Sequence, residues 1–198
     1  MIKAILFDMD GVLLDSYKMW FSMFEHALKK FMNQPLTDKE FKEHIWSRSF
    51  QILVKEYFPG KEKEVEAYYF PKVKDYMDQM EVYPVEDVLK QLKEKGLKTA
   101  IVSNTFTSTV NQMLTKAGFD KYFDLVLGGD CVKHAKPSPD SLLFCLDKLN
   151  LKPQEAIYIG DSKYDIQAGK AAKVFTVGLK IDGGNKTIKD LKELLTLV

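Results

Sequence analysis

The feature that most constrains the fold is an alternation of strand and helix signals from Pro84 to the end of the chain. Short apolar runs alternate with amphipathic segments, and Gly96 follows the first amphipathic segment as a helix-ending residue. Strands that alternate with helices pair in parallel, because each helix crosses back over the sheet. The alternation therefore predicts an α/β fold: a Rossmann-like parallel sheet with helices on both faces.

The predicted elements of this region follow one another closely. We expect strands at residues 97–102, 125–127, 156–159 and 174–177, and helices at 85–95, 107–117, 139–149, 163–172 and about 187–197. One further strand is expected at the start of the chain, where residues 2–7 form a short apolar run with β-branched and aromatic content.

A helical segment separates this first strand from the others. Trp20, Phe24, Ala27 and Phe31 recur at the spacing of one helix face. Residues 37–40, with the sequence Thr-Asp-Lys-Glu, form a capping box for a second helix. A third helical segment covers residues 61–80, where Pro71 is expected to kink the helix or to start a new one.

This interruption predicts two domains. Residues 1–15 and 84–198 would form the catalytic core, and residues 16–83 an inserted α-helical cap. More than half of the aromatic residues lie in the insert. They either fill the core of a small helical bundle or line a pocket over the sheet.

The composition of the chain limits the classes of partner and the cellular compartment that we expect for it. The net charge of +1, from 29 basic and 28 acidic residues, gives no electrostatic footprint for nucleic acid or an anionic membrane. Cys131 and Cys145 fit no metal or disulfide spacing and indicate free thiols in a reducing compartment. No apolar stretch is long enough to cross a bilayer, and the N-terminus does not have the pattern of a secretory signal. We expect a soluble cytoplasmic protein, either a monomer or a dimer.

Two aspartates directly follow the first strand, in the run Phe7-Asp8-Met9-Asp10-Gly11. Residues two apart on a strand point to the same side, and ligands of open parallel sheets bind at the carboxyl ends of the strands. Converging carboxylates require a cation, or one of them must hold a proton. Both conditions suit phosphoryl transfer with Mg²⁺. The alternative is a polar junction between a strand and a turn.

Other polar groups follow the later strands. Ser103 and Asn104 come after the second strand and could hold phosphate oxygens, although both residue types also cap helices. Lys136 stands between Ala135 and Pro137 and offers a compact positive charge. Asp161 and Asp165 follow the strand at 156–159; Asp161 is a suitable ligand for a hard cation, and Asp165 also completes a capping box with Ser162.

Together these four ordered motifs resemble those of the haloacid dehalogenase superfamily. The branch it resembles carries a helical cap between the first and second motifs and includes phosphoglycolate phosphatases and β-phosphoglucomutases. The resemblance implies that Asp8 is the nucleophile and Asp10 the general acid and base. It also implies that Ser103, with Asn104, and Lys136 bind the phosphoryl group. Mg²⁺ would be held by Asp8, Asp161 and the main-chain carbonyl of Asp10, supported by Asp165.

Three segments depart from this family pattern. His134 precedes Ala135-Lys136 where many relatives carry arginine and glycine, and no role is assigned to it. The run Thr105-Phe106-Thr107 cannot be assigned to any group of relatives that share a substrate. In the cap, Ser47 occupies a position at which relatives often have glycine, and the neighbouring Arg48 could clamp an acidic substrate or stay solvated.

The leading functional expectation is a phosphatase that acts on a small-molecule phosphate monoester through an aspartyl-phosphate. A sugar-phosphate mutase of the same architecture is the main alternative, and a catalytically weak regulatory module is the other. The resemblance disfavours dehalogenases and phosphonate-cleaving relatives, because these usually lack the aspartate found here as Asp10. The sequence does not name the substrate.

Overall fold

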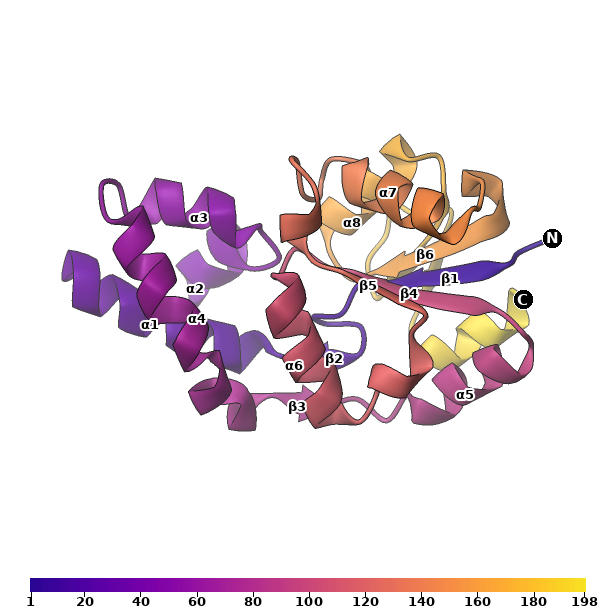
Figure 1. Cartoon of the computed structure of the whole chain (residues 1–198), viewed down its shortest axis with the longest axis horizontal. Coiled ribbons are helices and arrows are strands. Elements are labelled where there is room, and N and C mark those ends of the chain that lie inside the picture. The colour runs from indigo at the N-terminus through magenta and orange to yellow at the C-terminus, as the bar shows by residue number, and fades with distance from the viewer.

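The computed structural model describes all residues, 1–198, and contains a six-stranded sheet in the order β5-β4-β1-β6-β7-β8 (Figure 1). Every neighbouring pair in this sheet is parallel. The strands are β1 (Ala4–Phe7), β4 (Lys98–Val102), β5 (Leu125–Leu127), β6 (Ala156–Gly160), β7 (Phe175–Leu179) and β8 (Lys186–Ile188). The predicted α/β fold with a parallel sheet is confirmed.

The two faces of the sheet are covered by different helices, because successive side chains of a strand point to opposite sides. From β1, Ile5 and Phe7 join one hydrophobic cluster, together with α5 (Glu86–Glu94) and α6 (Thr107–Ala117). Ala4 and Leu6 join a second cluster, together with α7 (Asp140–Leu149) and α8 (Lys163–Ala171). Burial on both faces accounts for the continuous apolar runs of the central strands.

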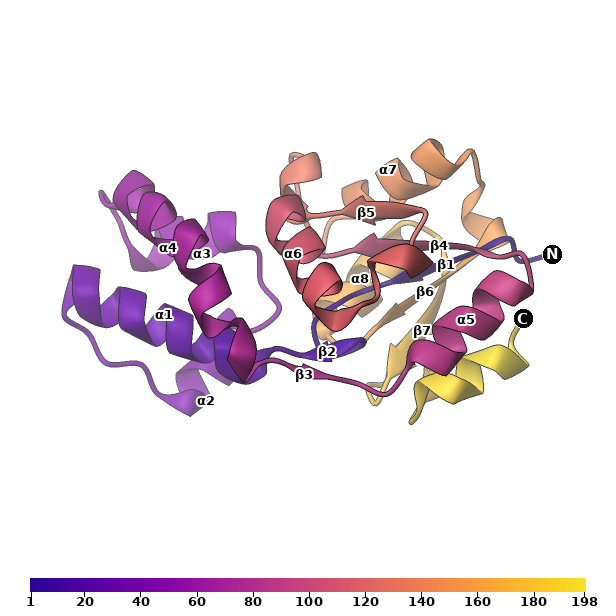
Figure 2. The same cartoon turned by 60° about the horizontal axis from the view of Figure 1, so that its bottom comes forward.

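The segment between β1 and β4 contains a group of helices that lies beyond the carboxyl ends of the strands (Figures 1 and 2). Its elements are α1 (Tyr17–Met32), α2 (Asp38–Glu40), a π-helical turn (Phe41–Ile45), α3 (Phe50–Tyr57), α4 (Glu62–Tyr76) and a 3₁₀ turn (Met77–Gln79). The hydroxyl of Thr37 accepts a hydrogen bond from the Glu40 amide, which is one of the two bonds of the predicted capping box. Helix α4 continues through Pro71, so no new helix begins there, and α3 was not predicted.

Two short strands connect this helical group to the sheet. β2 (Leu14–Asp15) pairs antiparallel with β3 (Glu81–Val82), so the outgoing and returning chains run side by side. This pair was not predicted, since two-residue strands leave no periodic pattern in the sequence.

The predicted helix from about Thr187 to Leu197 is wrong. The chain instead forms β8 and then a 3₁₀ helix (Leu191–Thr196). The β-branched residues Thr187 and Ile188 extend the sheet beside β7. Asp190 then starts the 3₁₀ helix by accepting a hydrogen bond from the Lys192 amide (2.8 Å).

The aromatic residues of the insert divide between two roles. Phe24 packs against the rings of Phe41, Tyr57 and Phe58 and so fills the interior of the helical group. Others line a cavity that faces the sheet, described below. None of the helices combines the length and the apolar character that a membrane span requires.

Candidate active site

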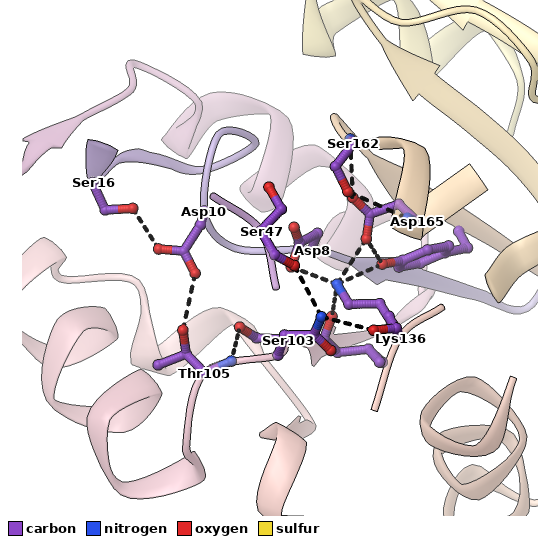
Figure 3. Close-up of polar contacts among 12 residues, drawn as sticks. Asp8, Asp10, Ser16, Ser47, Ser103, Thr105, Lys136, Ser162 and Asp165 are labelled. Atoms are coloured by element: carbon purple, nitrogen blue, oxygen red, sulfur yellow. Dashed lines mark hydrogen bonds and ion pairs between the residues drawn. The ribbon is translucent and has the colours of Figure 1, made fainter. Parts of the chain in front are cut away.

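The site lies where β1, β4 and β6 end, and these three strands are neighbours in the sheet. Asp8 follows β1, Ser103 follows β4, and Asp161 follows β6. Because the strands are parallel, their carboxyl ends meet at one edge, and residues far apart in the sequence come together there (Figure 3).

Lys136 occupies the centre of the polar network although its side chain is only 3% exposed. Its three N–H groups face four oxygens within hydrogen-bond distance: Asp8 Oδ1 (2.8 Å), Asp165 Oδ1 (2.7 Å), the carbonyl of Val102 (2.9 Å) and the hydroxyl of Tyr158 (3.0 Å). Burial pushes the pKa of Lys136 down, but the charges of Asp165 and Asp8 push it further up, so the net shift is upward. Lys136 is therefore a permanent positive charge between two carboxylates.

Asp8, Asp161 and Asp165 form an acidic cluster in which one oxygen from each lies within 4.8 Å of the others. Burial, and then the charge of Asp165, raises the pKa of Asp161 to about 7. The same two causes raise the pKa of Asp8, in spite of Lys136. Like charges held this close in a buried site favour a proton or a cation between them.

The chemistry of this cluster fits Mg²⁺. Asp161 Oδ1 is buried and has no hydrogen-bond partner, which leaves a carboxylate oxygen free to act as a metal ligand. Buried polar atoms normally have a partner, so an orphaned oxygen beside two other carboxylates calls for a cation. Hard oxygen ligands of this type are the ones that Mg²⁺ prefers.

Gly11 allows the cluster to form. Its φ of +79° suits glycine, and a Cβ at this position would lie 1.9 Å from Asp161 Oδ2. Any side chain at residue 11 would therefore displace the Asp161 carboxylate from its place in the cluster.

Asp165 forms the predicted capping box and also contacts Lys136. It caps α8 together with Ser162, whose amide donates to Asp165 Oδ2 (3.0 Å), and its other oxygen receives the Lys136 ammonium and the Tyr158 hydroxyl (2.5 Å). Burial acts to raise the pKa of Asp165, but Lys136 and the other donors outweigh it, so the pKa is lowered. Asp165 is thus an ionised anchor for Lys136.

The carboxylate of Asp10 points away from the acidic cluster and is held by three donors. Oδ1 accepts from the hydroxyl of Ser16, and Oδ2 accepts from the hydroxyl of Thr105 (3.3 Å) (Figure 3). Oδ1 also accepts from the indole Nε1 of Trp20 (2.9 Å). Trp20 belongs to α1 of the insert, and Thr105 follows β4. The side chain of Asp10 is therefore no member of the metal-binding cluster, and its main-chain carbonyl stays the predicted ligand.

Ser103 and Asn104 are buried beside Asp8, but they differ in what they can offer a ligand. The Ser103 oxygen accepts from the Thr105 amide (3.0 Å), so its own proton is free to donate. The Asn104 Nδ2 donates to the carbonyls of Ser47 and Lys136, both at 3.0 Å. Neither residue is an N-cap, since α6 begins after Phe106. Asn104 instead ties a loop of the insert to the loop that carries Lys136.

The loop of the insert approaches the site through Ser47 and Arg48. Ser47 has φ of +66°, the left-handed conformation that favours glycine. Arg48 lines the cavity, but its guanidinium already pairs with Glu56 (2.6 Å) and donates to the carbonyl of His44 (2.7 Å). His134 lies at the surface and pairs with Asp140 (3.0 Å).

Three residues with contacts in the site were missed by sequence reasoning: Trp20, Thr105 and Tyr158. Trp20 belongs to an apolar helix face, and Tyr158 to an apolar strand, so their patterns indicate only burial. Thr105 stands beside two predicted residues, and its proximity to Ser103 and Asn104 was the one available signal.

Comparison with known proteins agrees with this geometry. Residues 5–179 match the family model described as haloacid dehalogenase-like hydrolase. The chain is 32% identical to pyrophosphatase PpaX of Listeria monocytogenes, over 90% of this chain and 83% of that protein. It is 31% identical to phosphoglycolate phosphatase 1 of Pseudomonas aeruginosa, over 87% of this chain and 67% of that protein.

Among solved structures, a HAD-superfamily hydrolase of subfamily IA from Geobacter sulfurreducens superposes over the full length of both chains with a TM-score of 0.84, at 24% identity. This likeness shows a common fold. The family model, which covers most of the chain, and the curated relatives together establish that this protein belongs to the haloacid dehalogenase-like hydrolases, as one of their phosphatases.

Proposed function

We propose that this phosphatase hydrolyses small-molecule phosphate monoesters through an aspartyl-phosphate on Asp8. One observation carries the proposal: the buried carboxylate of Asp8, at the end of β1, is bonded to the Lys136 ammonium and belongs to an acidic cluster suited to Mg²⁺. An anionic nucleophile can approach an anionic ester only where nearby positive charge offsets the repulsion.

The first step uses Asp8 as nucleophile and Asp10 as acid. A carboxylate oxygen of Asp8 forms a bond to phosphorus, the bond from phosphorus to the ester oxygen breaks, and the leaving oxygen takes a proton from Asp10. In the second step Asp10 accepts a proton from water, the water oxygen attacks phosphorus, and inorganic phosphate leaves Asp8. Ser103 and Lys136 would orient the phosphoryl oxygens by donating hydrogen bonds.

Mg²⁺ would be held by Asp8, Asp161 and the main-chain carbonyl of Asp10, with Asp165 in support. When bound, it would neutralise charge on the phosphoryl group and on Asp8 and so favour the ionised nucleophile. Burial and neighbouring carboxylates raise the pKa of Asp8, which makes this compensation a requirement of the mechanism.

The insert would act as a cap. We propose that residues 16–83 form this cap and that residues 1–15 and 84–198 form the catalytic core. The position of the helical group beyond the strand ends, and the bond from Asn104 to the Ser47 carbonyl, support this division. Closure of a cap over the strands would exclude water from the first step.

Hydrolysis is favoured over a mutase reaction by the state of Arg48. A mutase must grip a free sugar phosphate while it returns the phosphoryl group, and the sole cation of the insert that lines the cavity is already paired with Glu56. Arg48 is thus a weak candidate for a substrate clamp. Pyrophosphate and phosphoglycolate, taken from the names of the relatives, are the first natural compounds to assay.

The decisive experiment compares the unmodified protein with Asp8→Asn. The amide cannot act as an anionic nucleophile, so we expect phosphate release from an aryl phosphate with Mg²⁺ to fall by at least about 10³-fold, while the thermal midpoint changes little. A variant that kept a tenth of the rate would refute the role of Asp8. The same assay with hexose phosphates and a bisphosphate primer separates the two reactions, because a mutase would isomerise the sugar faster than it releases phosphate.

A further inference from the structure

The cavity above Asp8 and Asp10 is rich in aromatic residues, which make up eight of the 20 residues that line it. It is partly open to solvent, and more than half of its lining residues are hydrophobic. The aromatic residues include Trp20, Phe50, Tyr69, Phe70 and Phe106; Trp46, Phe24 and Phe41 also line the cavity. Ligand pockets of proteins are lined mainly by hydrophobic and aromatic side chains, and an apolar wall of this kind favours apolar ligands.

A continuous row of rings leads away from Asp10. Trp20 donates to Asp10 and lies parallel to Tyr69, with centroids 6.3 Å apart. The row continues from Tyr69 to Phe50, with ring centroids 4.6 Å apart, and from Phe50 to Phe70, at 5.2 Å between centroids. It ends at Phe106, whose ring centroid lies 4.5 Å from that of Phe70. Asp10 protonates the leaving oxygen in the proposed mechanism, so the group attached to that oxygen begins where this row begins.

The cavity has no cation left for a second anionic group. Lys136 and Arg48 are the only lysine, arginine or histidine side chains that line it. Lys136 is bonded to Asp8 and Asp165, and Arg48 is bonded to Glu56. A second phosphate or a carboxylate would therefore lose its water in a largely apolar space without gaining a free cation as partner, which is unfavourable.

From these contacts we infer that the enzyme prefers phosphate monoesters of apolar alcohols, with the aryl or alkyl group against the aromatic row, over substrates that carry a second anionic group. This inference rests on the proposed function. It distinguishes the chain from what the names of its relatives indicate, since the leaving groups of pyrophosphate and phosphoglycolate are anionic.

The first test is a series of ethyl, butyl and hexyl phosphate, whose leaving alcohols have nearly the same acidity. We expect kcat/KM to rise about fourfold for each methylene that the cavity buries. Phosphoglycolate and pyrophosphate should give values below that of hexyl phosphate. A flat alkyl series, or a pyrophosphate value above that of hexyl phosphate, would overturn the inference.

The second test places one lysine on α3 at two positions. Phe50 lines the cavity, whereas Ile52 is 47% exposed and lines none of it. Phe50→Lys should lower kcat/KM for hexyl phosphate by about tenfold or more, because it places a hydrated charge in the apolar space. The ratio of kcat/KM for hexyl phosphate to kcat/KM for pyrophosphate should therefore fall. Ile52→Lys, with the same added charge, should leave the hexyl-to-pyrophosphate ratio unchanged. If the hexyl-to-pyrophosphate ratio of kcat/KM were the same in Phe50→Lys and Ile52→Lys, the inference would be contradicted.

Two controls keep the outcomes distinct. Phe50→Leu preserves an apolar wall and should retain the order of the alkyl series, so it serves if Phe50→Lys does not fold. Acetyl phosphate has almost no leaving group to bury and reports the chemistry alone. Release of phosphate from acetyl phosphate with a flat alkyl series would defeat only the inference, whereas no release in the presence of Mg²⁺ would defeat the proposed function itself.

Discussion

At the scale of single residues, the environments of Asp8 and Asp10 differ although the residues are two apart. Asp8 faces Lys136 and the acidic cluster, and Asp10 faces Ser16, Trp20 and Thr105. A nucleophile needs nearby positive charge, and a general acid needs a fixed orientation toward the leaving oxygen. The two sets of neighbours match these two roles.

Trp20→Phe tests the orientation of Asp10. The change keeps a ring against Tyr69 but removes the indole donor to Oδ1. We expect turnover of an alkyl phosphate to fall about tenfold, because a hydrogen bond to a charged group is worth about 1.5–3 kcal/mol. Turnover of an aryl phosphate, which needs little protonation, should change less.

The matched control for this test is Trp46→Phe. Trp46 lines the same cavity and makes no hydrogen bond to Asp10. If both variants lowered alkyl and aryl turnover by the same factor, Trp20 would act on the shape of the cavity and not on Asp10.

At the scale of elements, Asp124 joins α5 to the start of β4. Its Oδ2 accepts from the Thr99 amide (2.8 Å), and both of its oxygens lie 2.8 Å from Lys93 Nζ on α5. Partial burial acts to raise the pKa of Asp124, but Lys93 and the Thr99 amide outweigh it, so the pKa lies below the ordinary 3.8. The folded state therefore favours the ionised carboxylate.

Asp124→Asn should lower the free energy of unfolding at pH 7 by about 1 kcal/mol, a modest value because the carboxylate is 38% exposed. A depressed folded pKa stabilises the protein above the unfolded pKa, and this contribution disappears as pH falls through the lower folded pKa. The difference in the free energy of unfolding between the unmodified protein and Asp124→Asn should thus be fully present at pH 7 and shrink below about pH 4. Urea unfolding at pH 7 and in acid measures it.

Asp120→Asn is the control for this prediction. Asp120 is an exposed carboxylate in the same connection, and its side chain has no hydrogen bond. A loss of stability equal to that of Asp124→Asn, or a loss that persists in acid, would show that Lys93 and Thr99 do not stabilise the charge.

At the scale of the whole molecule, the acidic cluster brings together residues 8, 161 and 165, which belong to the two ends of the sequence. Folding forces these carboxylates together, and their mutual repulsion opposes the folded state until a cation binds. A ligand that binds only the folded protein stabilises it by mass action.

We expect Mg²⁺ to raise the thermal midpoint and to be required for turnover. Free Mg²⁺ at a hundred times its Kd should add about 2.7 kcal/mol to the free energy of unfolding. Ca²⁺ should also stabilise the fold but inhibit turnover, since it accepts more oxygens at longer distances and can occupy both oxygens of Asp8. Differential scanning calorimetry and phosphate release, each with Mg²⁺, Ca²⁺ or a chelator, provide the measurements.

Asp161→Asn should abolish the rise in thermal midpoint, whereas Asp147→Asn, which removes an exposed carboxylate of α7, should preserve it. Equal Mg²⁺-dependent shifts in the two variants would place the metal elsewhere. Full turnover in excess chelator would exclude a catalytic metal altogether.

The sequence by itself determined the parallel sheet, the helical insert after β1 and the edge at which Asp8, Ser103 and Asp161 meet. Each depends on local signals: apolar runs, helix spacing and polar residues at strand ends. The short strands β2, β3 and β8 were missed, because two or three residues carry too little pattern and their pairing depends on distant segments.

Only the tertiary structure decided which partner each side chain of the site contacts. The indole of Trp20 reaches Asp10, Arg48 is paired with Glu56, and the aromatic residues of the insert both fill its interior and line the cavity. Helix periodicity specifies which residues are buried, but not which distant group each one meets. Those contacts follow from the packing of the insert against the ends of the strands, and that packing depends on side chains from segments far apart in the sequence.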